Sequence, residues 1–353
     1  MEKKKVSKKK RIFKVFLTVI LSVCLFFLVI NVVPPKKVVK TNPFIVGDGL
    51  PLLAAHRGGG DNAPENTMAA YIKAVNENKA DIIETDMCLT KDGYLVFIHD
   101  RTIDDTSDVD MIEFGVEDDG NDNHYVKDYT LAELKQFNFG YKYEENGNRI
   151  YKDIVSEYAL DDTKRGEVLQ ESKLQIVELS ELFENFYVSN PNLLFIIEIK
   201  NSGEDGLKAV KVFDEVMKNY PEYADQIVIG TFNPEVEAEL KKVTPNTLRG
   251  ASTSSAAKFV ATQMLGVNLF DNSDFSCLQI PMSFDFELKD DLELTLTLDK
   301  RNYINRAHRR NMAVQYWTIN DESDMRRLIH LGCDAIMTDN PKLLREVLDS
   351  YSK

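Results

Sequence analysis

The chain has 353 residues, 43% of them hydrophobic and 28% charged, which is ordinary for a globular protein with a large core. Its net charge is −14, and residues 1–14 alone carry +7, which leaves −21 for the remainder. So acidic a body argues against nucleic acid as a partner and is compatible with the uptake of divalent cations.

The N-terminal stretch predicts a membrane anchor. A basic segment at 1–14 precedes an apolar run at 15–33 that only three polar residues interrupt. A helix of about 20 apolar residues spans the hydrocarbon core, and basic flanks stay in the cytoplasm. We therefore expect a single-pass anchor in the cell membrane, with the rest of the chain outside the cytoplasm. A cleaved signal peptide is the alternative, but the run is long and no small-x-small site precedes Pro34.

The body, at 51–350, follows a linker predicted at 34–50 and alternates short apolar runs with helical stretches. This alternation implies βαβ units and a parallel sheet. Eight candidate strands, each followed by a plausible helix, favour an α/β fold of the TIM (β/α)8 barrel type over an open sheet. The expected strands are Leu52–His56, Asp81–Leu89, Leu193–Lys200, Gln226–Phe232, Thr247–Ala251, Cys277–Met282, Ala313–Thr318 and Asp334–Thr338.

An acidic interval after the second strand breaks this alternation. A helix at Thr130–Phe137, opened by a capping box, lies inside it. The interval covers about residues 104–172, and loops of that length without helices or strands are uncommon. We therefore expect it to be a small insertion packed beside the barrel mouth. The Asp118–Asp122 run lacks the spacing of a calcium-binding EF-hand loop and is better interpreted as a solvated acidic loop.

The four cysteines give no sign of a disulfide framework or a zinc site. Cys24 lies in the predicted anchor, and Cys88, Cys277 and Cys333 are scattered and leave an odd count. We expect all four to be buried thiols.

The second expected strand carries two carboxylates near its end. Residues two apart in a strand share a face, so Glu84 and Asp86 point the same way. Two carboxylates directed into a barrel are costly unless something positive lies between them, and barrel active sites form where strands end. A hard divalent cation with oxygen ligands is the natural occupant. For an isolated pair, an ordinary acidic strand end would be the better interpretation.

A tight turn at 91–94 predicts a histidine beside this pair. With its central Asp-Gly as a two-residue hairpin loop, paired positions have numbers that sum to 185, which sets His99 opposite Asp86. Directly opposed residues of an antiparallel pair share a face. We therefore expect His99 to project toward both carboxylates.

Polar groups also follow two other strands. His56 is suited to general acid or base catalysis, and Arg57 offers a fork of donors for phosphate oxygens. Glu198 and Lys200 share a face, one able to bind a metal and the other a phosphate oxygen. A simple salt bridge between these two is the competing interpretation.

Two further residues carry weaker signals. Glu65 opens the first helix of the body, where it is a possible metal ligand or supports one, although acidic residues are common at such positions. Trp317, the only tryptophan, ends the seventh strand and either walls the pocket or fills the core.

Together these residues resemble the glycerophosphodiester phosphodiesterase family. The matching pieces occur in the family's order and cover most of residues 51–345. They are His56-Arg57-Gly58, Pro64-Glu65-Asn66-Thr67, Ile83-Glu84-Thr85-Asp86, Lys91-Asp92-Gly93, His99-Asp100, Glu198-Ile199-Lys200, Trp317-Thr318-Ile319-Asn320 and Thr338-Asp339.

The resemblance implies a TIM-barrel hydrolase of lipid metabolism that cleaves glycerophosphodiesters to glycerol 3-phosphate and an alcohol, with calcium or magnesium bound. Its substrate would be a glycerophosphodiester or a glycerol-phosphate polymer. By the same resemblance, the metal ligands would be Glu84, Asp86 and Glu198, the acid–base pair His56 and His99, and the phosphate-binding residues Arg57 and Lys200.

Two other functions stay open. A related phospholipase or lysophospholipase D-type phosphodiesterase would need an apolar rim at its mouth; the candidates are Phe284, Phe286, Phe137, Phe139, Tyr141 and Tyr143. An inactive, membrane-tethered binding module would have lost a histidine or a carboxylate of the site, but all are present.

Overall fold

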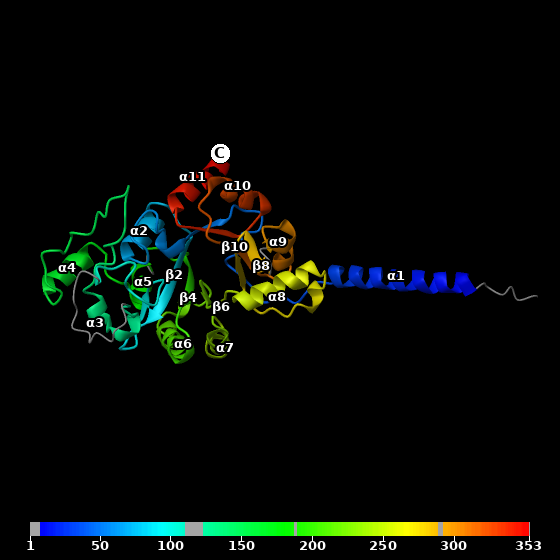
Figure 1. The fold of residues 1–353 in the computed structure, drawn as a ribbon, viewed down its shortest axis with the longest axis horizontal. Coiled ribbons are helices and arrows are strands. Elements are labelled where there is room, and N and C mark those ends of the chain that lie inside the picture. Colours follow the sequence, from blue (N-terminus) through cyan, green and yellow to red (C-terminus); the bar gives the residue numbers. More distant parts are fainter. Residues whose placement is uncertain (1–7, 110–122, 187–188, 289–291, 353) are drawn as a thin grey trace, which may run out of the picture.

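The structure is a computed structural model that describes residues 8–109, 123–186, 189–288 and 292–352. Its body is a nearly closed barrel of parallel strands in the spatial order β6-β5-β4-β2-β1-β11-β10-β7 (Figure 1). A parallel bridge from Gly250 to Cys277 joins the two ends of this order. The barrel strands are β1 (Leu52–Ala55), β2 (Ile82–Leu89), β4 (Leu194–Ile199), β5 (Ile227–Gly230), β6 (Leu248–Arg249), β7 (Cys277–Ile280), β10 (Ala313–Tyr316) and β11 (Ala335–Thr338).

The prediction of a TIM barrel is confirmed, and each expected strand exists. Side chains alternate along the strands: Ala54, Ile82 and Leu194 point into the barrel interior, whereas Leu53 and Ile83 pack against the outer helices. The helices around the body are α2 (Met68–Asn76), α5 (Leu179–Phe186), α6 (Gly203–Met217), α7 (Pro234–Val243), α8 (Thr253–Met264), α9 (Arg301–His308), α10 (Glu322–Leu331) and α11 (Pro341–Tyr351).

Local signals set the ends of several of these helices. Thr67 accepts from the Ala70 amide and begins α2, and Asp321 accepts from two amides and begins α10. Gly332, at φ +80°, ends α10 in the left-handed conformation that glycine adopts without strain. Both ends of α10 are therefore set by signals that are local in the sequence.

The hairpin of β2 with β3 (Leu95–Phe97) has a different register from the prediction. Met87 pairs with Phe97 and Leu89 with Leu95, so paired numbers sum to 184 rather than 185. The loop has three residues rather than two, and Gly93 closes it at φ +90°, as a three-residue hairpin loop requires. The prediction that His99 lies directly opposite Asp86 is therefore wrong.

The insertion after the second barrel strand has its own small core. It contains the short helix η3 (Val126–Asp128), α3 (Leu131–Leu134) and α4 (Thr163–Glu171), and its apolar residues pack with Cys88 and Val96 of the barrel hairpin. The buried Arg165 guanidinium pairs with Asp108 and also donates to three backbone carbonyls. The predicted capping box is present, although α3 is shorter than the expected helix at Thr130–Phe137. The acidic run 117–122 lies outside the described residues.

The N-terminal helix α1 (Lys8–Val32) projects from the body, whereas the insertion with α3 and α4 lies at the far end of the molecule (Figure 1). Residues 10–32 form a helix that is long and apolar enough to cross a membrane. An 18-residue stretch of this helix has a mean hydropathy of 2.8, and 6% of that stretch is buried. A signal sequence can have the same length and composition. Cys24 is exposed on this helix, which corrects the expectation that all four thiols are buried; the other three are buried.

Residues 38–46 of the predicted linker pack against the barrel. The Val38 amide donates to the Arg310 carbonyl at 2.8 Å, and the Val46 amide to Asp334 Oδ1 at 3.1 Å. Phe44 is fully buried among the interior residues at the end where the barrel strands begin. This segment, here called the strap, closes the base of the barrel.

One pair of strands was absent from the prediction. β8 (Ser283–Leu288) and β9 (Leu292–Thr297) form a separate antiparallel hairpin after β7. The predicted rim residue Phe284 lies on β8 and is exposed. The side chain of Phe286 lies outside what the structure describes.

Candidate active site

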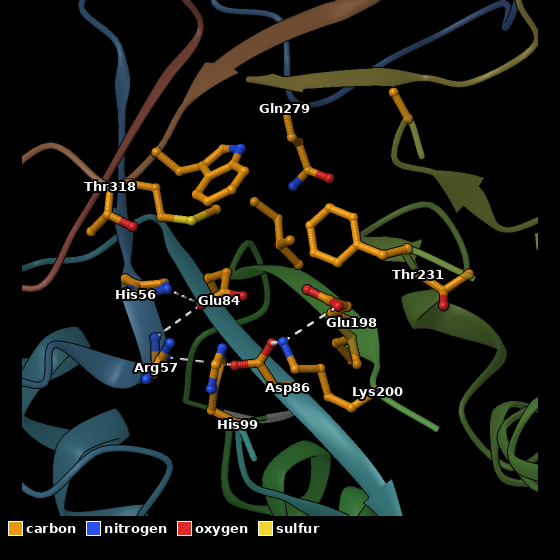
Figure 2. A pocket seen from close by; sticks show the side chains of 17 residues that line it. His56, Arg57, Glu84, Asp86, His99, Glu198, Lys200, Thr231, Gln279 and Thr318 are labelled. Carbon is orange, nitrogen blue, oxygen red and sulfur yellow. Dashed lines mark hydrogen bonds and ion pairs between the residues drawn. The ribbon is translucent and has the colours of Figure 1, made fainter. Parts of the chain in front are cut away.

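A cavity of about 170 Å³ opens at the mouth of the barrel, the end where the strands finish. Eight of the nine predicted site residues line it, drawn from five different segments of the chain (Figure 2). These are His56, Arg57, Glu84, Asp86, His99, Glu198, Lys200 and Trp317. Glu65 does not line the cavity; its carboxylate holds Arg57 from behind, with Oε2 3.1 Å from Arg57 Nη1.

His56 is held by a carboxylate that received no role in the sequence analysis. Its Nδ1 lies 2.5 Å from Asp339 Oδ1, and the amide of Asn320 donates to Asp339 Oδ2 at 2.7 Å. Since a carboxylate only accepts, Nδ1 carries the proton, and Nε2 is the ring nitrogen left for chemistry. Burial lowers the pKa of His56, but the hydrogen bond with Asp339 and the charge of Glu84 outweigh burial and raise it overall.

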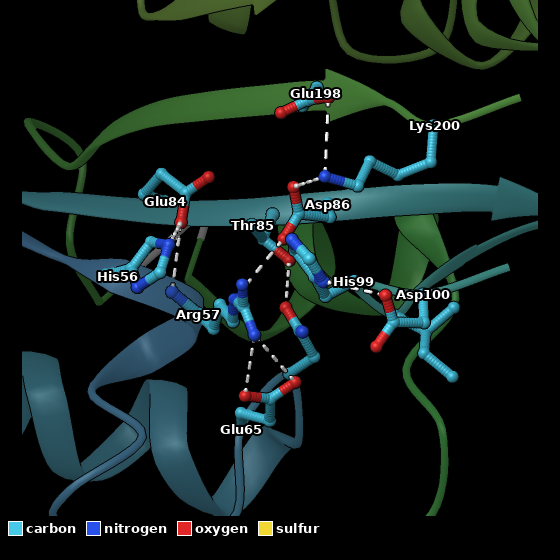
Figure 3. A network of polar contacts seen from close by, with 12 residues as sticks. His56, Arg57, Glu65, Glu84, Thr85, Asp86, His99, Asp100, Glu198 and Lys200 are labelled. Carbon is cyan, nitrogen blue, oxygen red and sulfur yellow. Dashed lines mark hydrogen bonds and ion pairs between the residues drawn. The ribbon is translucent and has the colours of Figure 1, made fainter. Parts of the chain in front are cut away.

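The backbone turns sharply at Arg57, and this turn points both its amide and its guanidinium at the carboxylates. Arg57 has φ +53°, and its amide donates to Glu84 Oε2 at 3.0 Å. Its Nε lies 3.8 Å from Asp86 Oδ2 (Figure 3). Gly58 follows at φ +82°, where a Cβ would lie 2.8 Å from the Tyr71 ring, so only glycine fits this turn.

Three carboxylates concentrate negative charge in the cavity. Glu84 and Asp86 are buried, and burial followed by the charge of Asp86 raises the pKa of Glu84 to about 8. Burial likewise raises the pKa of Glu198 to about 7, against the opposing charge of Lys200. Such shifts mean that the protein scaffold alone does not neutralise this charge well.

Lys200 lies between two of these carboxylates. Its Nζ is 3.2 Å from Asp86 Oδ1 and 3.4 Å from Glu198 Oε1. Asp86 Oδ2 is buried and accepts no hydrogen bond from the described residues. Among the residues that the structure describes, no three acidic, histidine or cysteine side chains lie close enough together to coordinate a metal ion as they stand. The donor set of carboxylate oxygens, one of them unsatisfied, nevertheless suits a hard divalent cation.

His99 reaches the cavity although the register prediction was wrong. β3 ends at Phe97, and the chain leaves the hairpin before residue 99, so strand pairing does not set the direction of this side chain. Its Nδ1 lies 3.1 Å from Asp100 Oδ1. Burial lowers the pKa of His99, and the charges of Arg57 and Lys200 act in the same direction against the opposing charge of Asp86.

The far wall of the cavity includes residues that the sequence analysis missed. Thr231, Phe232 and Gln279 line it, and the Phe232 and Trp317 rings lie 6.5 Å apart between centroids. Trp317 also packs against the barrel interior, so both interpretations of this residue hold. Gly250 gives Gln279 its space, because a Cβ at Gly250 would collide with the Gln279 amide. The sequence signal for Gln279 was the presence of a glutamine within an otherwise apolar strand.

This combination of strand-end groups matches one family across the body. The family model described as "Glycerophosphoryl diester phosphodiesterase family" covers residues 56–343. The chain belongs to this family. It is therefore a phosphodiesterase by class, as the sequence predicted.

Known relatives agree with this assignment. A glycerophosphodiester phosphodiesterase of Caldanaerobacter subterraneus is 28% identical over 302 residues, which are 83% of this chain and 96% of that protein. The barrel is also similar to a glycerophosphodiester phosphodiesterase from Agrobacterium tumefaciens, with TM-score 0.56, 17% identity, and coverage of 84% and 100%. An Oleispira antarctica phosphodiesterase, solved in complex with the product sn-glycerol-3-phosphate, has TM-score 0.55, 21% identity, and coverage of 85% and 97%.

Proposed function

We propose that this chain hydrolyses glycerophosphodiesters to glycerol 3-phosphate and an alcohol, with His56 and His99 as its acid–base pair. The observation that carries the proposal is the meeting of both histidines with three carboxylates and two cationic side chains in one cavity. The product named for the structurally similar Oleispira phosphodiesterase agrees with this reaction.

The proposed reaction begins inside the substrate. The glycerol hydroxyl next to the phosphodiester attacks phosphorus, one histidine accepts its proton, and the other protonates the leaving alcohol oxygen. Water then opens the cyclic phosphate, and the two histidines exchange roles. Each ring has a carboxylate at Nδ1, Asp339 for His56 and Asp100 for His99, so Nε2 is the nitrogen that exchanges the proton.

Two cationic side chains are proposed to bind the phosphate. Arg57 presents planar donors fixed by Glu65 at 3.1 Å, and Lys200 presents an ammonium that already bridges two carboxylates. Both side chains are partly buried, and nearby carboxylates raise the pKa of each against the effect of burial. They therefore stay charged throughout the pH range in which the histidines exchange protons.

A divalent cation, calcium or magnesium, completes the proposed site. Glu84, Asp86 and Glu198 would hold it through their oxygens, which is the ligand type that both ions prefer. When bound, such an ion neutralises charge that develops on the phosphoryl oxygens. The unsatisfied Asp86 Oδ2 and the raised pKa of Glu84 both support the need for an added positive charge.

Lipid substrates are the second candidate, and the buried aromatic residues count against them. The rim expected from the insertion is incomplete, because Phe137 and Phe139 lie in its core. One observation still favours a lipid: Phe232 is about half exposed and lines the cavity beside Trp317. A mouse relative named a lysophospholipase D, 23% identical over 321 residues, makes the same candidate worth testing.

We also propose that α1 is an uncleaved single-pass anchor and that the body lies outside the cytoplasm. The basic residues before α1 favour a cytoplasmic N-terminus. On this proposal residues 1–14 are the cytoplasmic segment, 15–33 the span and 51–350 the catalytic body with its insertion at about 104–172.

The deciding experiment is an assay of glycerol 3-phosphate release from glycerophosphocholine by the full chain in detergent micelles. We expect release with calcium or magnesium and none with chelator. His56→Ala and His99→Ala should each lower kcat by about 100-fold or more. His330→Ala, on the outer helix α10, is the matched control and should retain full activity.

Each opposite result has a clear meaning. Undiminished release in chelator would contradict the proposed cation, and an active His56→Ala enzyme would contradict the proposed acid–base pair. Release from lysophospholipid but not from glycerophosphocholine would establish the lipid candidate instead.

A further inference from the structure

The C-terminal end of α1 is hydrogen-bonded to the base of the barrel. Arg309 Nη1 donates to the Asn31 carbonyl at 2.7 Å, and its Nη2 reaches the carbonyls of Val32 and Val33 at 3.3 and 3.1 Å. These are carbonyls at the C-terminal end of α1, where a positive side chain is favoured. Asn31 Nδ2 also donates to the Gly266 carbonyl at 3.2 Å.

Apolar side chains of the body continue this contact along the helix. Met264, Leu265 and Phe270, here called the membrane patch, are each between 59% and 69% exposed. The Phe270 ring stacks on Phe26 of α1, with centroids 6.2 Å apart and planes 23° from parallel. Exposed apolar residues this close together are costly in water and typical of interaction surfaces.

The span itself fixes the depth of this patch. Phe26 is six residues before Val32, the last residue of α1, so it lies about 9 Å along the axis from the end of the helix. If α1 spans the bilayer, Phe26 lies within the hydrocarbon of the outer leaflet. Phe270, stacked on it, must then enter the same layer.

The chain direction shows which end of the barrel carries the patch. α8 starts after the end of β6 and finishes at Met264, and α9 finishes just before β10 begins. The patch and Arg309 therefore lie at the base, where the strap also binds. Along β11, Asp334 holds the strap and Asp339 holds His56, five residues or about 16 Å apart.

We propose that the body stands base-down on the outer face of the lipid bilayer, with the membrane patch inserted beside α1 and the catalytic mouth facing away. The membrane patch thus contacts the bilayer that α1 spans. The arrangement in Figure 1 agrees, because the insertion, which follows a strand end at the mouth, lies at the far end of the molecule from α1.

This orientation selects the class of substrate and, in that respect, rests on the proposed function. A lipid embedded in the same bilayer cannot reach a mouth that opens on the opposite side of the barrel. Diesters that are soluble, or that belong to a polymer extending outward from the membrane, can reach it. The inference therefore favours deacylated glycerophosphodiesters and glycerol-phosphate polymers over lysophospholipids.

The test is electron paramagnetic resonance on the full chain in liposomes, with a nitroxide at Leu265→Cys. Cys24→Ser removes the exposed native thiol, and the other native cysteines are buried. Ile150→Cys, on the insertion and 48% exposed, is the matched control. Leu21→Cys on the span is the lipid reference. We expect the ratio of oxygen to nickel-complex accessibility at 265 to be about tenfold above that at 150 and close to that at 21.

A nitroxide at 265 that is as accessible to nickel as the one at 150 would overturn the membrane docking, whatever the enzyme does. The orientation has its own test in the same liposomes, with glycerophosphocholine outside and lysophosphatidylcholine in the bilayer. We expect hydrolysis of the soluble diester to be at least about tenfold faster. Equal rates would overturn the outward-facing mouth. If neither substrate were cleaved, the proposed function would fail while the spectroscopic result still decided the docking.

Discussion

The two ends of the barrel are built from the same strands but have opposite character. At the base, Phe44 fills the interior, and the Val38 and Val46 amides of the strap are hydrogen-bonded to the barrel. At the mouth, Glu84 and Asp86 are buried close together, and one oxygen of Asp86 accepts no hydrogen bond from the part of the chain that the structure describes. Packing stabilises the base, whereas holding charges close together for chemistry destabilises the mouth.

The largest expected effect is a loss of stability without a loss of activity, caused by a substitution at the base. Phe44→Ala removes a fully buried ring from the barrel interior and should lower the free energy of unfolding by about 3–5 kcal/mol. Because Phe44 is remote from the mouth, kcat at temperatures below unfolding should be unchanged. Thermal unfolding and a steady-state assay at 20 °C, both on the full chain, check the two halves of this prediction. A large loss of kcat in folded protein would show that base and mouth are coupled.

The next effect concerns a partner of the proposed acid–base pair. Asp339→Asn removes the charge that orients His56 and supports its protonated form. We expect kcat/KM to fall about 10- to 100-fold, with little change in thermal stability. Asp321→Asn, which alters a helix cap on α10, is the control and should leave kcat/KM alone. If Asp339→Asn had wild-type activity, either His56 would take no part in the mechanism or its contact with Asp339 would not matter for catalysis.

A smaller effect should run in the opposite direction to Phe44→Ala. Asp86→Asn relieves repulsion with Glu84, so in chelator it should raise the free energy of unfolding by about 1 kcal/mol. With metal present, the same substitution should abolish activity. The stabilisation that calcium or magnesium gives to the wild type should also disappear. Differential scanning calorimetry with and without metal measures both changes. Loss of stability in chelator would mean that the Lys200 contact with Asp86 outweighs the repulsion.

The pH dependence of metal binding should reveal the same charge concentration. The pKa of Glu84 is about 8 in the folded chain, above its usual value, so folded protein keeps a proton that unfolded protein releases. Without metal, stability therefore falls as pH rises from the usual carboxyl pKa toward 8. Because a cation displaces that proton, metal affinity should rise between pH 6 and 8 and level off above. Isothermal titration calorimetry at pH 6, 7 and 8.5 checks this; an affinity independent of pH would contradict it.

The smallest effect concerns the two histidines themselves. In chelator, His56 should titrate above the usual histidine pKa and His99 below it, because Asp339 and Glu84 favour the charged form of His56 whereas burial disfavours that of His99. Nuclear magnetic resonance of the imidazole carbons measures both, with His56→Ala and His99→Ala for assignment. Equal titration of both rings would show that their surroundings do not distinguish them.

The sequence by itself determined the barrel and most of the mouth. Alternating strands and helices repeat along the chain, and strand-end positions such as Glu84, Asp86 and Glu198 follow from local periodicity, because residues two apart share a face. The helix signal at Thr130 was equally local, and its capping box forms.

Contacts distant in the sequence decided the rest. A three-residue loop shifted the hairpin register by one, yet the chain after Phe97 still delivered His99 to the cavity. Gln279 and Asp339 acquire their places only when the barrel closes, and Phe44 only when the strap folds back on the base. The contact of Phe26 with Phe270 joins residues on separate helices. Local propensity carries no information about such pairings, because their energy exists only after the closed barrel brings the partners together.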